Sequence, residues 1–480
     1  MKHRKGCMLQ LKTKAAVLTS LLLVSALIIL VNIRPALSNP ATLLVPSQYS
    51  TIQAALAVAG PGDTIRVAAD HVANENSLVI TQNGLTLQGE NKDTTIIDGG
   101  NSGNRVIIVE ADNVVISGFT IRNAGTSYGA FGTFLNYSKN AYLTNNIFSG
   151  CSFLVRADHC TNVTVTSSTF LDGTFSQGAA MYAIHCQTGL IESNTFNGNY
   201  VGAFVVFSTG FIIRNNSFSS CIYHGATISH SAGNWVVKNT FTFNDASIVI
   251  KYSESVDNTV IGNTVSNSNE GLSLQYTVSN NIIHHNNFIN NVQQVNFTDS
   301  LLSNVWSTSL PIAEGNYWSN YAGIDANKDG IGDSAYNVGT GNQDPYPLIG
   351  RFTEFSVANQ TGTYNVYAIS NSLIQNFGFD QAAKKIDFSV SGTSGTTGIC
   401  RVVFPKGLVL SPYTVFVNGV NQTYGSAGNS THIALYFSYV HGNQASSIVI
   451  IPEFPAMLIL PLLMLLTLLI AALKRKKYSG

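Results

Sequence analysis

The sequence predicts an all-β chain whose main part is a solenoid of stacked, parallel β-strands. Three observations support this class. A short element recurs about every 23 residues, no helical periodicity runs between the recurrences, and charged residues make up only 10% of the 480 residues, with 41 Gly. An ordinary soluble domain has roughly 25% charged residues. A charge-rich disordered chain is therefore excluded, and without a Lys/Arg cluster in the body we expect no nucleic-acid partner.

The N-terminal residues 1–38 have the pattern of a secretory signal peptide. A basic stretch, residues 1–14, precedes seventeen uncharged residues, 15–31, and the small residues Ala36 and Ser38 follow. This order is typical of a signal peptide that is removed. The alternative is an uncleaved anchor, since seventeen residues are at the lower limit for a membrane span.

The repeat is centred on a triplet such as Asn194-Thr195-Phe196. Its third positions step by 22, 26, 22, 23, 24 and 23 residues; they are Phe148, Phe170, Phe196, Phe218, Phe241, Val265 and Phe288. A unit this short cannot bury its apolar face alone, but stacked units can. We expect about ten coils, with the Phe side chains stacked in one column and the Asn side chains in another, one rung being ~4.8 Å. A β-sandwich would show turn signals every ~8–12 residues without such a column.

Two terminal segments complete the pattern. Residues 45–56 read as strand, turn and helix, and Gly60-Pro61-Gly62-Asp63-Thr64-Ile65 then opens the first rung. Residues 315–321 have the sequence GNYWSNY. With the repeats, these segments resemble the NosD-like group of the pectin-lyase-like superfamily over residues 42–350. The resemblance implies a right-handed parallel β-helix with an N-terminal cap helix that covers its open end.

Beyond residue 350 the repeat is lost. Residues 351–450 contain β-rich segments separated by Gly/Asn/Ser turns, so we expect a small β-sandwich that acts as a stalk. It resembles the Ig-like terminal domain of archaeal surface proteins.

The C-terminus predicts a membrane anchor. Residues 456–473 are eighteen uncharged residues, long enough for a transmembrane helix of ~27 Å. The basic tail, residues 474–480, is then cytoplasmic and the body extracellular. Residues 451–455, IPEFP, resemble the Pro-Glu-Phe sorting signal of archaeal surface proteins, which implies cleavage and transfer to a lipid. A permanent anchor is the alternative.

Charge agrees with a membrane protein. Six of the 25 Lys/Arg lie in residues 1–38 and four in 456–480, so the body has 15 of them against all 25 Asp/Glu, a net charge of −10. We expect the protein at the cell surface, anchored in the cytoplasmic membrane. The sequence names no protein partner.

A loop near the end of the rod predicts a structural calcium site. Residues 325–333, DANKDGIGD, have oxygen ligands spaced as in the first part of an EF-hand loop, around Gly330. The predicted ligands are Asp325, Asn327, Asp329, Ile331 through its carbonyl, and Asp333. Position 12 is Tyr336 and departs from the pattern, so Asp344 could supply a late ligand. The alternative is a metal-free loop closed by Asx turns.

Two His-Cys pairs occupy equivalent places in consecutive coils. His159 and His185 lie 11 residues before the column Phe, and Cys160 and Cys186 lie 10 before it. We expect the thiols to point inward and the imidazoles outward. A copper or zinc site at these four residues is a weaker alternative, and the sequence disfavours copper. No disulfide framework is expected.

The leading functional hypothesis is a glycan-binding, adhesive or structural protein of the cell envelope. Ring stacking on sugars is expected at Tyr182, Tyr200, Tyr223 and Tyr252. N-glycosylation sequons occur at Asn136, Asn162, Asn215, Asn296, Asn359, Asn421 and Asn429. The alternatives are a polysaccharide lyase or hydrolase and NosD-like handling of copper. Catalysis is disfavoured because the carboxylates of the rod scatter over different registers, and because Arg156 and Arg214 lack an obvious carboxylate partner.

Overall fold

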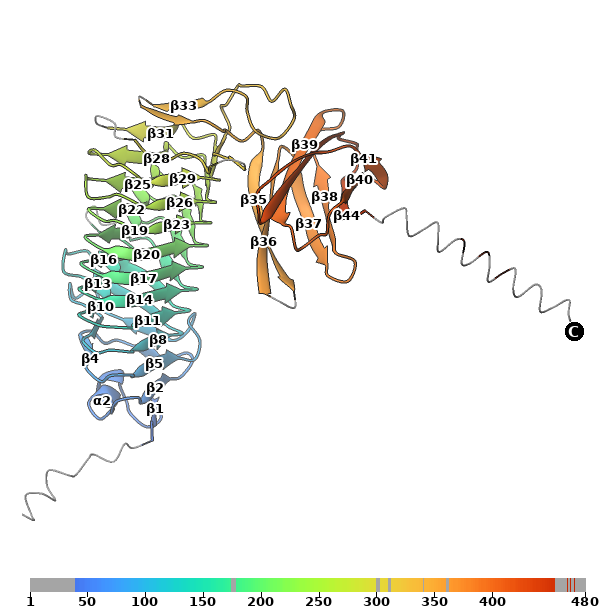
Figure 1. Ribbon diagram of the computed structural model, residues 1–480. Coiled ribbons are helices and arrows are strands. Elements are labelled where there is room, and N and C mark those ends of the chain that lie inside the picture. The colour runs from blue at the N-terminus through green and yellow to red at the C-terminus, as the bar shows by residue number, and fades with distance from the viewer. Residues whose placement is uncertain are drawn as a thin grey trace, which may run out of the picture.

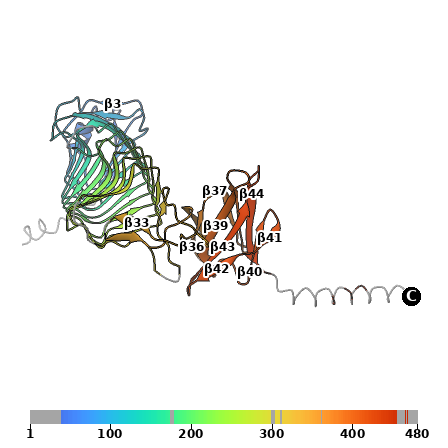
Figure 2. The same ribbon diagram turned by 90° about the horizontal axis from the view of Figure 1, so that it is seen from above.

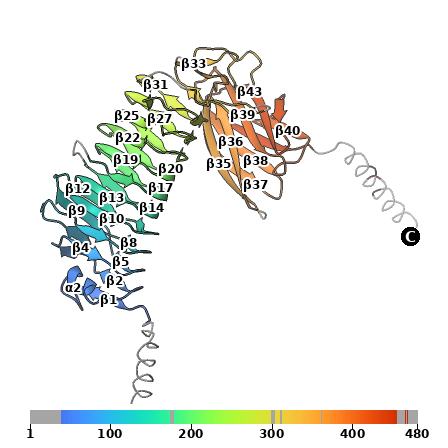
Figure 3. The same ribbon diagram turned by 60° about the vertical axis from the view of Figure 1, so that its left-hand side comes forward.

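The computed structural model describes residues 39–173, 178–298, 303–309, 312–339, 341–359 and 362–453, together with Met464, Thr467 and Ile470. Two bodies follow one another along the chain: a long rod of stacked strands, and a smaller β-sandwich beside its last coils (Figures 1 and 3). The predicted signal peptide, residues 1–38, lies outside the described residues. So does the predicted span, residues 456–473, apart from the three isolated positions. Within the described part of the chain, no helix is long and apolar enough to cross a membrane.

The rod is a parallel β-solenoid of about eleven turns, as predicted. Each complete turn contributes one strand to each of three sheets, so from β2 to β31 neighbours in a sheet are three strands apart in sequence, and the pairs β1–β2 and β30–β32 at the two ends are the exceptions. Sheet A contains β1 (Thr42–Val45), β2 (Thr64–Val67), β5 (Thr86–Gly89), β8 (Val115–Ser117), β11 (Tyr142–Thr144), β14 (Thr161–Thr166), β17 (Gln187–Glu192), β20 (Thr209–Arg214), β23 (Trp235–Val237), β26 (Thr259–Ile261) and β29 (Ile282–His284).

Sheets B and C complete each turn (Figure 2). Sheet B contains β3 (Val72–Ala73), β6 (Ile96–Asp98), β9 (Thr120–Gly125), β12 (Ile147–Cys151), β15 (Thr169–Leu171), β18 (Thr195–Asn197), β21 (Ser217–Ser219), β24 (Thr240–Thr242), β27 (Thr264–Ser266), β30 (Asn287–Ile289) and β32 (Tyr317–Trp318). Sheet C contains β4 (Leu78–Ile80), β7 (Ile107–Val109), β10 (Phe131–Asn136), β13 (Phe153–Asp158), β16 (Met181–Ile184), β19 (Val201–Val206), β22 (His224–Ser229), β25 (Ala246–Lys251), β28 (Glu270–Gln275) and β31 (Gln293–Phe297).

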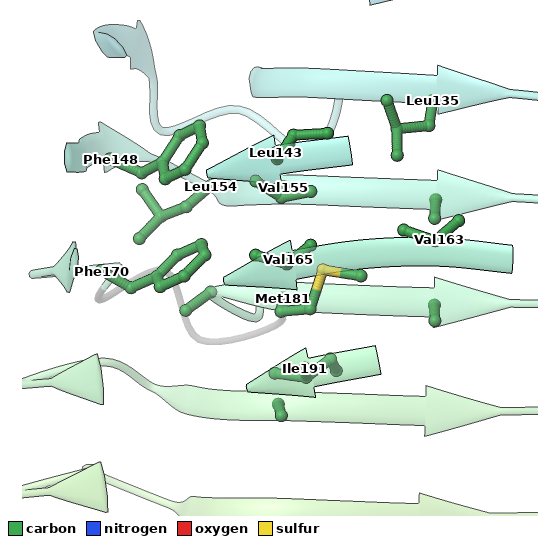
Figure 4. Close-up of a cluster of buried hydrophobic side chains, with 14 of the residues drawn as sticks. Leu135, Leu143, Phe148, Leu154, Val155, Val163, Val165, Phe170, Met181 and Ile191 are labelled. Carbon is green, nitrogen blue, oxygen red and sulfur yellow. The ribbon is translucent and has the colours of Figure 1, made fainter. Parts of the chain in front are cut away.

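The predicted Phe column is present in the core. From Phe148 to Phe241 the five column rings pair directly across sheet B, and successive ring centroids are 4.6–5.0 Å apart. Figure 4 shows Phe148 and Phe170 one above the other. All five rings are fully buried. Trp318 stacks on Phe288 at 4.6 Å and extends the column to the end of the rod.

The predicted Asn column is a ladder of buried amides. The Oδ1 atom of Asn216 accepts a hydrogen bond from the backbone N–H of Asn194 at 2.9 Å. Its Nδ2 atom donates to the carbonyl oxygen of Ile191 at 2.8 Å and to Oδ1 of Asn239 at 3.0 Å. The ladder thus pairs backbone groups at a corner between strands, where buried polar groups need partners.

A short helix, α2 (Ile52–Leu56), lies at the N-terminal end of the rod. The Thr51 hydroxyl accepts a hydrogen bond from the backbone N–H of Ala54 and caps the helix. Ile52, Ala55 and Leu56 are buried in the rod core. The sequence predicted a helix here, and its capping role stays a prediction.

The last coils lead through an antiparallel hairpin, β33 (Tyr336–Gly339) and β34 (Asn342–Asp344), into the sandwich. The sandwich has two five-stranded antiparallel sheets that enclose a second core. One sheet contains β35 (Arg351–Asn359), β36 (Gly362–Ser370), β39 (Thr397–Pro405), β43 (His432–Val440) and β42 (Gly425–Gly428). The other contains β37 (Leu373–Asp380), β38 (Lys385–Ser391), β44 (Ser446–Pro452), β40 (Tyr413–Val417) and β41 (Val420–Gln422).

Candidate functional site

The outer face of sheet C has a column of aromatic and cationic side chains. Phe134, Arg156, Tyr182 and Phe204 are direct partners on β10, β13, β16 and β19. Because side chains alternate along a strand and the flanking residues are buried in the core, these four point away from it. We call this set, with the side chains that pack on it, the aromatic face.

The rings of the aromatic face meet edge to face. Tyr182 contacts Phe153 at 5.2 Å and 71°, and Phe204 at 5.3 Å and 85°. Tyr182 and Phe204 stay half-buried, and burial raises the pKa of the Tyr182 hydroxyl above its ordinary value. Tyr200 packs on the same cluster and stacks on Tyr223 at 5.3 Å. Three of the four tyrosines predicted to stack on sugars are therefore on or beside this face.

Cations lie over the rings of the aromatic face. The Arg156 guanidinium is 5.2 Å from the Tyr182 centroid and within an ion-pair distance, 3.1 Å, of Asp158. Arg105, just before β7, lies 4.3 Å from the Phe134 centroid. The Lys251 ammonium, on β25, lies 5.2 Å from the Phe204 centroid. Such contacts are attractive because the ring face carries negative charge density.

Beside this face runs a second set of rings, which we call the corner ladder. Its members share left-handed φ angles of 45–71° and form one continuous stack with centroids 4.0–5.2 Å apart: Tyr137, His159, His185, Phe207, His230, Tyr252 and Tyr276. Tyr252 lies between His230 and Tyr276, which cover its two faces. Only the edge of the Tyr252 ring is therefore open to a ligand. Tyr252, the fourth tyrosine predicted to stack on sugars, is not part of the aromatic face.

The two predicted His-Cys pairs separate at this corner. Cys160 and Cys186 are buried, and the Cys186 sulfur accepts a hydrogen bond from the backbone N–H of Cys160 at 3.3 Å. His159 and His185 are exposed, with ring centroids 4.8 Å apart. Hydrogen bonding to Cys160 and burial raise the pKa of the Cys186 thiol, whereas the hydrogen bond with Cys186 lowers the pKa of Cys160. Two thiolates together, which a metal site with both cysteines needs, are therefore disfavoured.

The structure therefore does not assemble these four side chains into one ligand set. Among the described residues, no group of three His, Cys, Asp or Glu side chains is placed to hold a metal ion. The five cysteines in the described ranges are all free and buried.

The predicted calcium loop is closed by its own backbone N–H groups. The Asp325 carboxylate accepts hydrogen bonds from the N–H groups of Asp329 and Gly330 at 3.0 and 2.9 Å, and that of Asp333 accepts one from Ala326 at 2.8 Å. The Asn327 side chain accepts a hydrogen bond from the N–H of Asp329, and the Asp329 carboxylate accepts one from the N–H of Ile331. These are Asx-type turns, and calcium binding by the loop stays a prediction.

Asp344 is not available as a late ligand for that loop, so that suggestion from the sequence was wrong. Its buried carboxylate accepts hydrogen bonds from the backbone N–H of Asn316 at 2.7 Å and from the Trp318 indole at 2.9 Å. Burial raises its pKa to about 6. Asp344 instead closes the end of the rod beneath the last ring of the Phe column.

The view that Arg156 and Arg214 lack carboxylate partners was also wrong. Arg156 pairs with Asp158, two residues along the same strand, at 3.1 Å. Arg214 pairs with Glu192 on the preceding coil of sheet A at 2.7 Å. Neither guanidinium is thus a free base for lyase chemistry.

The predicted sequons differ in accessibility. Asn162, Asn215 and Asn421 are exposed, whereas Asn136, Asn296 and Asn429 are half-buried. The side chain of Asn359 lies outside the described set. The Asn296 amide donates to Glu270 at 2.6 Å. Glycosylation at all seven stays a prediction.

Sequence reasoning missed a buried polar cluster between the rod and the sandwich. The Glu314 carboxylate, fully buried, accepts hydrogen bonds from Arg401 at 2.6 Å and from the Tyr367 hydroxyl at 2.8 Å, and lies 3.0 Å from His285 Nε2. Although burial opposes it, hydrogen bonds and charge from His285 and Arg401 hold the pKa of Glu314 below its ordinary value. Lys238 pairs with Glu354 nearby at 3.0 Å.

It also missed Phe134, Arg156 and Phe204 as members of one face with Tyr182. The signal was available, because each lies 14 residues before a column Phe. The same register continues at Thr227.

Comparison with known proteins agrees with this geometry. Residues 68–218 match the family model described as "Right handed beta helix region", and residues 155–323 match "Periplasmic copper-binding protein (NosD)". The rod is therefore a right-handed parallel β-helix. Within that class, residues 155–323 are similar to the NosD family.

Two curated proteins share a limited stretch with the chain. Each is described as "Probable ABC transporter binding protein NosD", one from Stutzerimonas stutzeri and one from Pseudomonas aeruginosa. Each is 40% identical over 82 residues, which is 17% of this chain and 18% of the relative. The chain thus spans less than a fifth of the length of these relatives.

Two solved structures illustrate which folds this chain is similar to. The Dettilon tailspike protein has a TM-score of 0.40 and 12% identity, covering 86% of this chain and 85% of that chain. The alginate lyase from Paenibacillus sp. str. FPU-7 has a TM-score of 0.40 and 13% identity, covering 54% and 98%.

Proposed function

We propose that the protein is a membrane-anchored component of the cell envelope whose rod binds glycans through the aromatic face. The observation that carries this proposal is the outward column on consecutive coils of sheet C, with Tyr182 and Phe204 half-buried in edge-to-face contact. Edge-to-face contact leaves ring area that parallel stacking would cover. Aromatic rings next to polar groups suit sugars, which have apolar ring faces and polar rims.

The direct test is a glycan array probed with the full chain and with Tyr182→Ala. We expect the wild type to bind a subset of glycans and Tyr182→Ala to lose most of that binding. Tyr142→Ala is the matched control, because Tyr142 is a 39% exposed tyrosine on sheet A of the same rod. An array without any bound glycan, or equal binding by all three proteins, contradicts the proposal.

The anchor and the outward orientation of the body are part of the proposal and rest on the sequence of residues 456–480. Removal of these residues should release the protein from the membrane fraction into the medium. The body should also be degraded by protease added to intact cells. Retention of the shortened chain with the membrane would contradict anchoring by this segment.

NosD-like handling of copper is a second candidate, supported by the match of residues 155–323 to the family model. Of the four candidate metal ligands at the corner, the imidazoles of His159 and His185 are exposed to solvent, whereas the two thiols are buried. Copper retained stoichiometrically after dialysis, and lost in the double variant His159→Ala/His185→Ala, would support it. Copper retention that the double variant leaves unchanged would remove these residues from any copper site.

A further inference from the structure

The cations of the aromatic face lie at successive levels of the rod and are offset along the strands, since in the register of sheet C Arg156 lies three residues and Lys251 five residues beyond Arg105. Arg105 precedes β7, Arg156 is on β13 and Lys251 is on β25, and β7, β10, β13, β16, β19, β22 and β25 are successive strands of sheet C. At ~4.8 Å per strand, Arg156 is ~10 Å from the level of Arg105 and ~19 Å from that of Lys251. Rings fill the interval from Phe134 to Phe204.

Two of these cations have no acidic partner. Among the described residues, no carboxylate lies within ion-pair distance of Arg105 or Lys251. The Lys251 ammonium is half-buried against Phe204 and Tyr252, and burial lowers its pKa. A partly desolvated cation without a partner is unfavourable, and a bound anion would restore the lost interaction.

The strands of this face contain fewer acids than the body as a whole. The chain between residues 39 and 455 has a net charge of −10, yet within the strands of sheet C from β7 to β25 the one acid is Asp158, with Glu110 just after β7 and Asp245 just before β25. Asp158 is already paired with Arg156. His224, buried beside Lys251, adds no charge, because burial and the nearby ammonium lower its pKa to about 3. An acidic ligand would thus be drawn to Arg105 and Lys251, which have no acidic partner in the described part of the chain, rather than to the rest of the acidic body.

From this geometry we infer that the aromatic face binds a linear glycan that carries acidic groups, with the polymer crossing the strands of sheet C obliquely over Arg105, Arg156 and Lys251. The inference rests on the proposed glycan function and adds the charge class and the direction of the ligand. The strands of Arg105 and Lys251 are ~29 Å apart, and the rings that their charged groups contact, Phe134 and Phe204, are on strands ~14 Å apart. A single sugar is too short to contact both groups, whereas a polymer contacts them together. Rings between the cations contact the apolar faces of the sugars, and the cations pair with carboxylate or sulfate groups.

The test compares three polymers with the same glucan backbone: carboxymethylcellulose, cellulose sulfate and neutral hydroxyethylcellulose. Affinity for the full chain is measured at several salt concentrations. We expect the charged polymers to bind at least tenfold more tightly than the neutral one, and salt to weaken their binding. A preference between the two charged polymers identifies the acidic group as carboxylate or sulfate.

Variants locate the site. Arg105→Gln and Lys251→Gln should each weaken binding of the charged polymer by about three- to tenfold and reduce its salt dependence. Lys139→Gln is the matched control, since it removes one exposed positive charge from the corner before sheet A, and it should stay within about twofold of the wild type. Thermal midpoints show whether each variant is folded, and the salt series on the wild type needs no variant.

The outcomes separate this inference from the glycan function. Equal affinity for the neutral and charged polymers, or array binding restricted to neutral glycans, overturns the acidic class and leaves glycan binding intact. Charged-polymer binding that Arg105→Gln and Lys251→Gln leave unchanged overturns the site. An empty array together with no binding of the three polymers overturns both.

Discussion

Truncation of one amide in the buried Asn ladder should destabilise the rod strongly. In Asn216→Ala the protein loses the acceptor for the Asn194 backbone N–H at 2.9 Å and the donor to the Ile191 carbonyl at 2.8 Å. The Asn194 N–H is then buried without that acceptor, while the Ile191 carbonyl loses its side-chain donor but stays in the ladder between β17 and β20. A stranded donor costs about 1–3 kcal/mol and each further lost hydrogen bond about 1 kcal/mol, so we expect a loss of about 2–4 kcal/mol in the free energy of unfolding.

Asn216→Ser should cost less, by about 1–2 kcal/mol, because serine is accommodated elsewhere in the same ladder. The Ser168 hydroxyl accepts the backbone N–H of Asn146 at 3.1 Å in the equivalent place. Asn197→Ala is the surface control: this side chain is exposed, and its loss should change stability by less than about 0.5 kcal/mol.

The assay is urea unfolding followed by far-UV circular dichroism, with midpoints and slopes compared among the three variants and the wild type. The expected order of stability is Asn197→Ala, then Asn216→Ser, then Asn216→Ala. If Asn216→Ala unfolds at the same urea concentration as Asn197→Ala, the ladder does not contribute as its geometry requires.

Three further predictions concern the core, the end of the rod and the loop. Phe218→Ala, which removes a fully buried ring stacked at 4.6 and 4.7 Å, should cost about 3–5 kcal/mol, whereas Phe243→Ala, at a 64% exposed ring, should be nearly neutral by urea unfolding. The pKa of Asp344 is raised from 3.8 to about 6, so the folded state binds its proton more tightly than the unfolded state. Its contribution to stability should therefore fall by at most about 3 kcal/mol as pH rises from about 4 to 6; the difference between the melting profiles of wild type and Asp344→Asn measures this, and identical pH profiles would contradict it. Calcium should raise the melting temperature of the wild type, reversibly with chelator, and leave that of Asp329→Ala unchanged; no shift in the wild type would refute the loop as a calcium site.

Much of the rod was predictable because a solenoid places equivalent residues of successive coils beside one another. A constant spacing then converts directly into contact, as with Phe196 and Phe218 in the core. The same register correctly predicted that the thiol of Cys186 points inward and the imidazole of His185 outward. It also contained the aromatic face, since Arg156 and Tyr182 occupy one register, but that column mixes residue types and its common position was not recognised.

The partners of charged residues were harder to predict. Arg156 and Asp158 are two apart on one strand and so share a face, while Arg214 reaches Glu192 across 22 residues. Both ion pairs could be derived from the repeat if the first and last residues of each strand were known. The sequence indicated the repeat but not those strand boundaries.

Sequence alone determined the repeating architecture of this protein: its parallel coils, the Phe and Asn columns of its core, and the corner where thiols and imidazoles part. Only the tertiary structure showed the contacts between residues that lie outside the repeat. Glu314 meets Arg401 and Tyr367 across 87 and 53 residues, because the sandwich packs against the last coils. A one-dimensional repeat fixes neighbours within the rod, whereas the docking of a non-repeating body depends on the shape and charge of both surfaces.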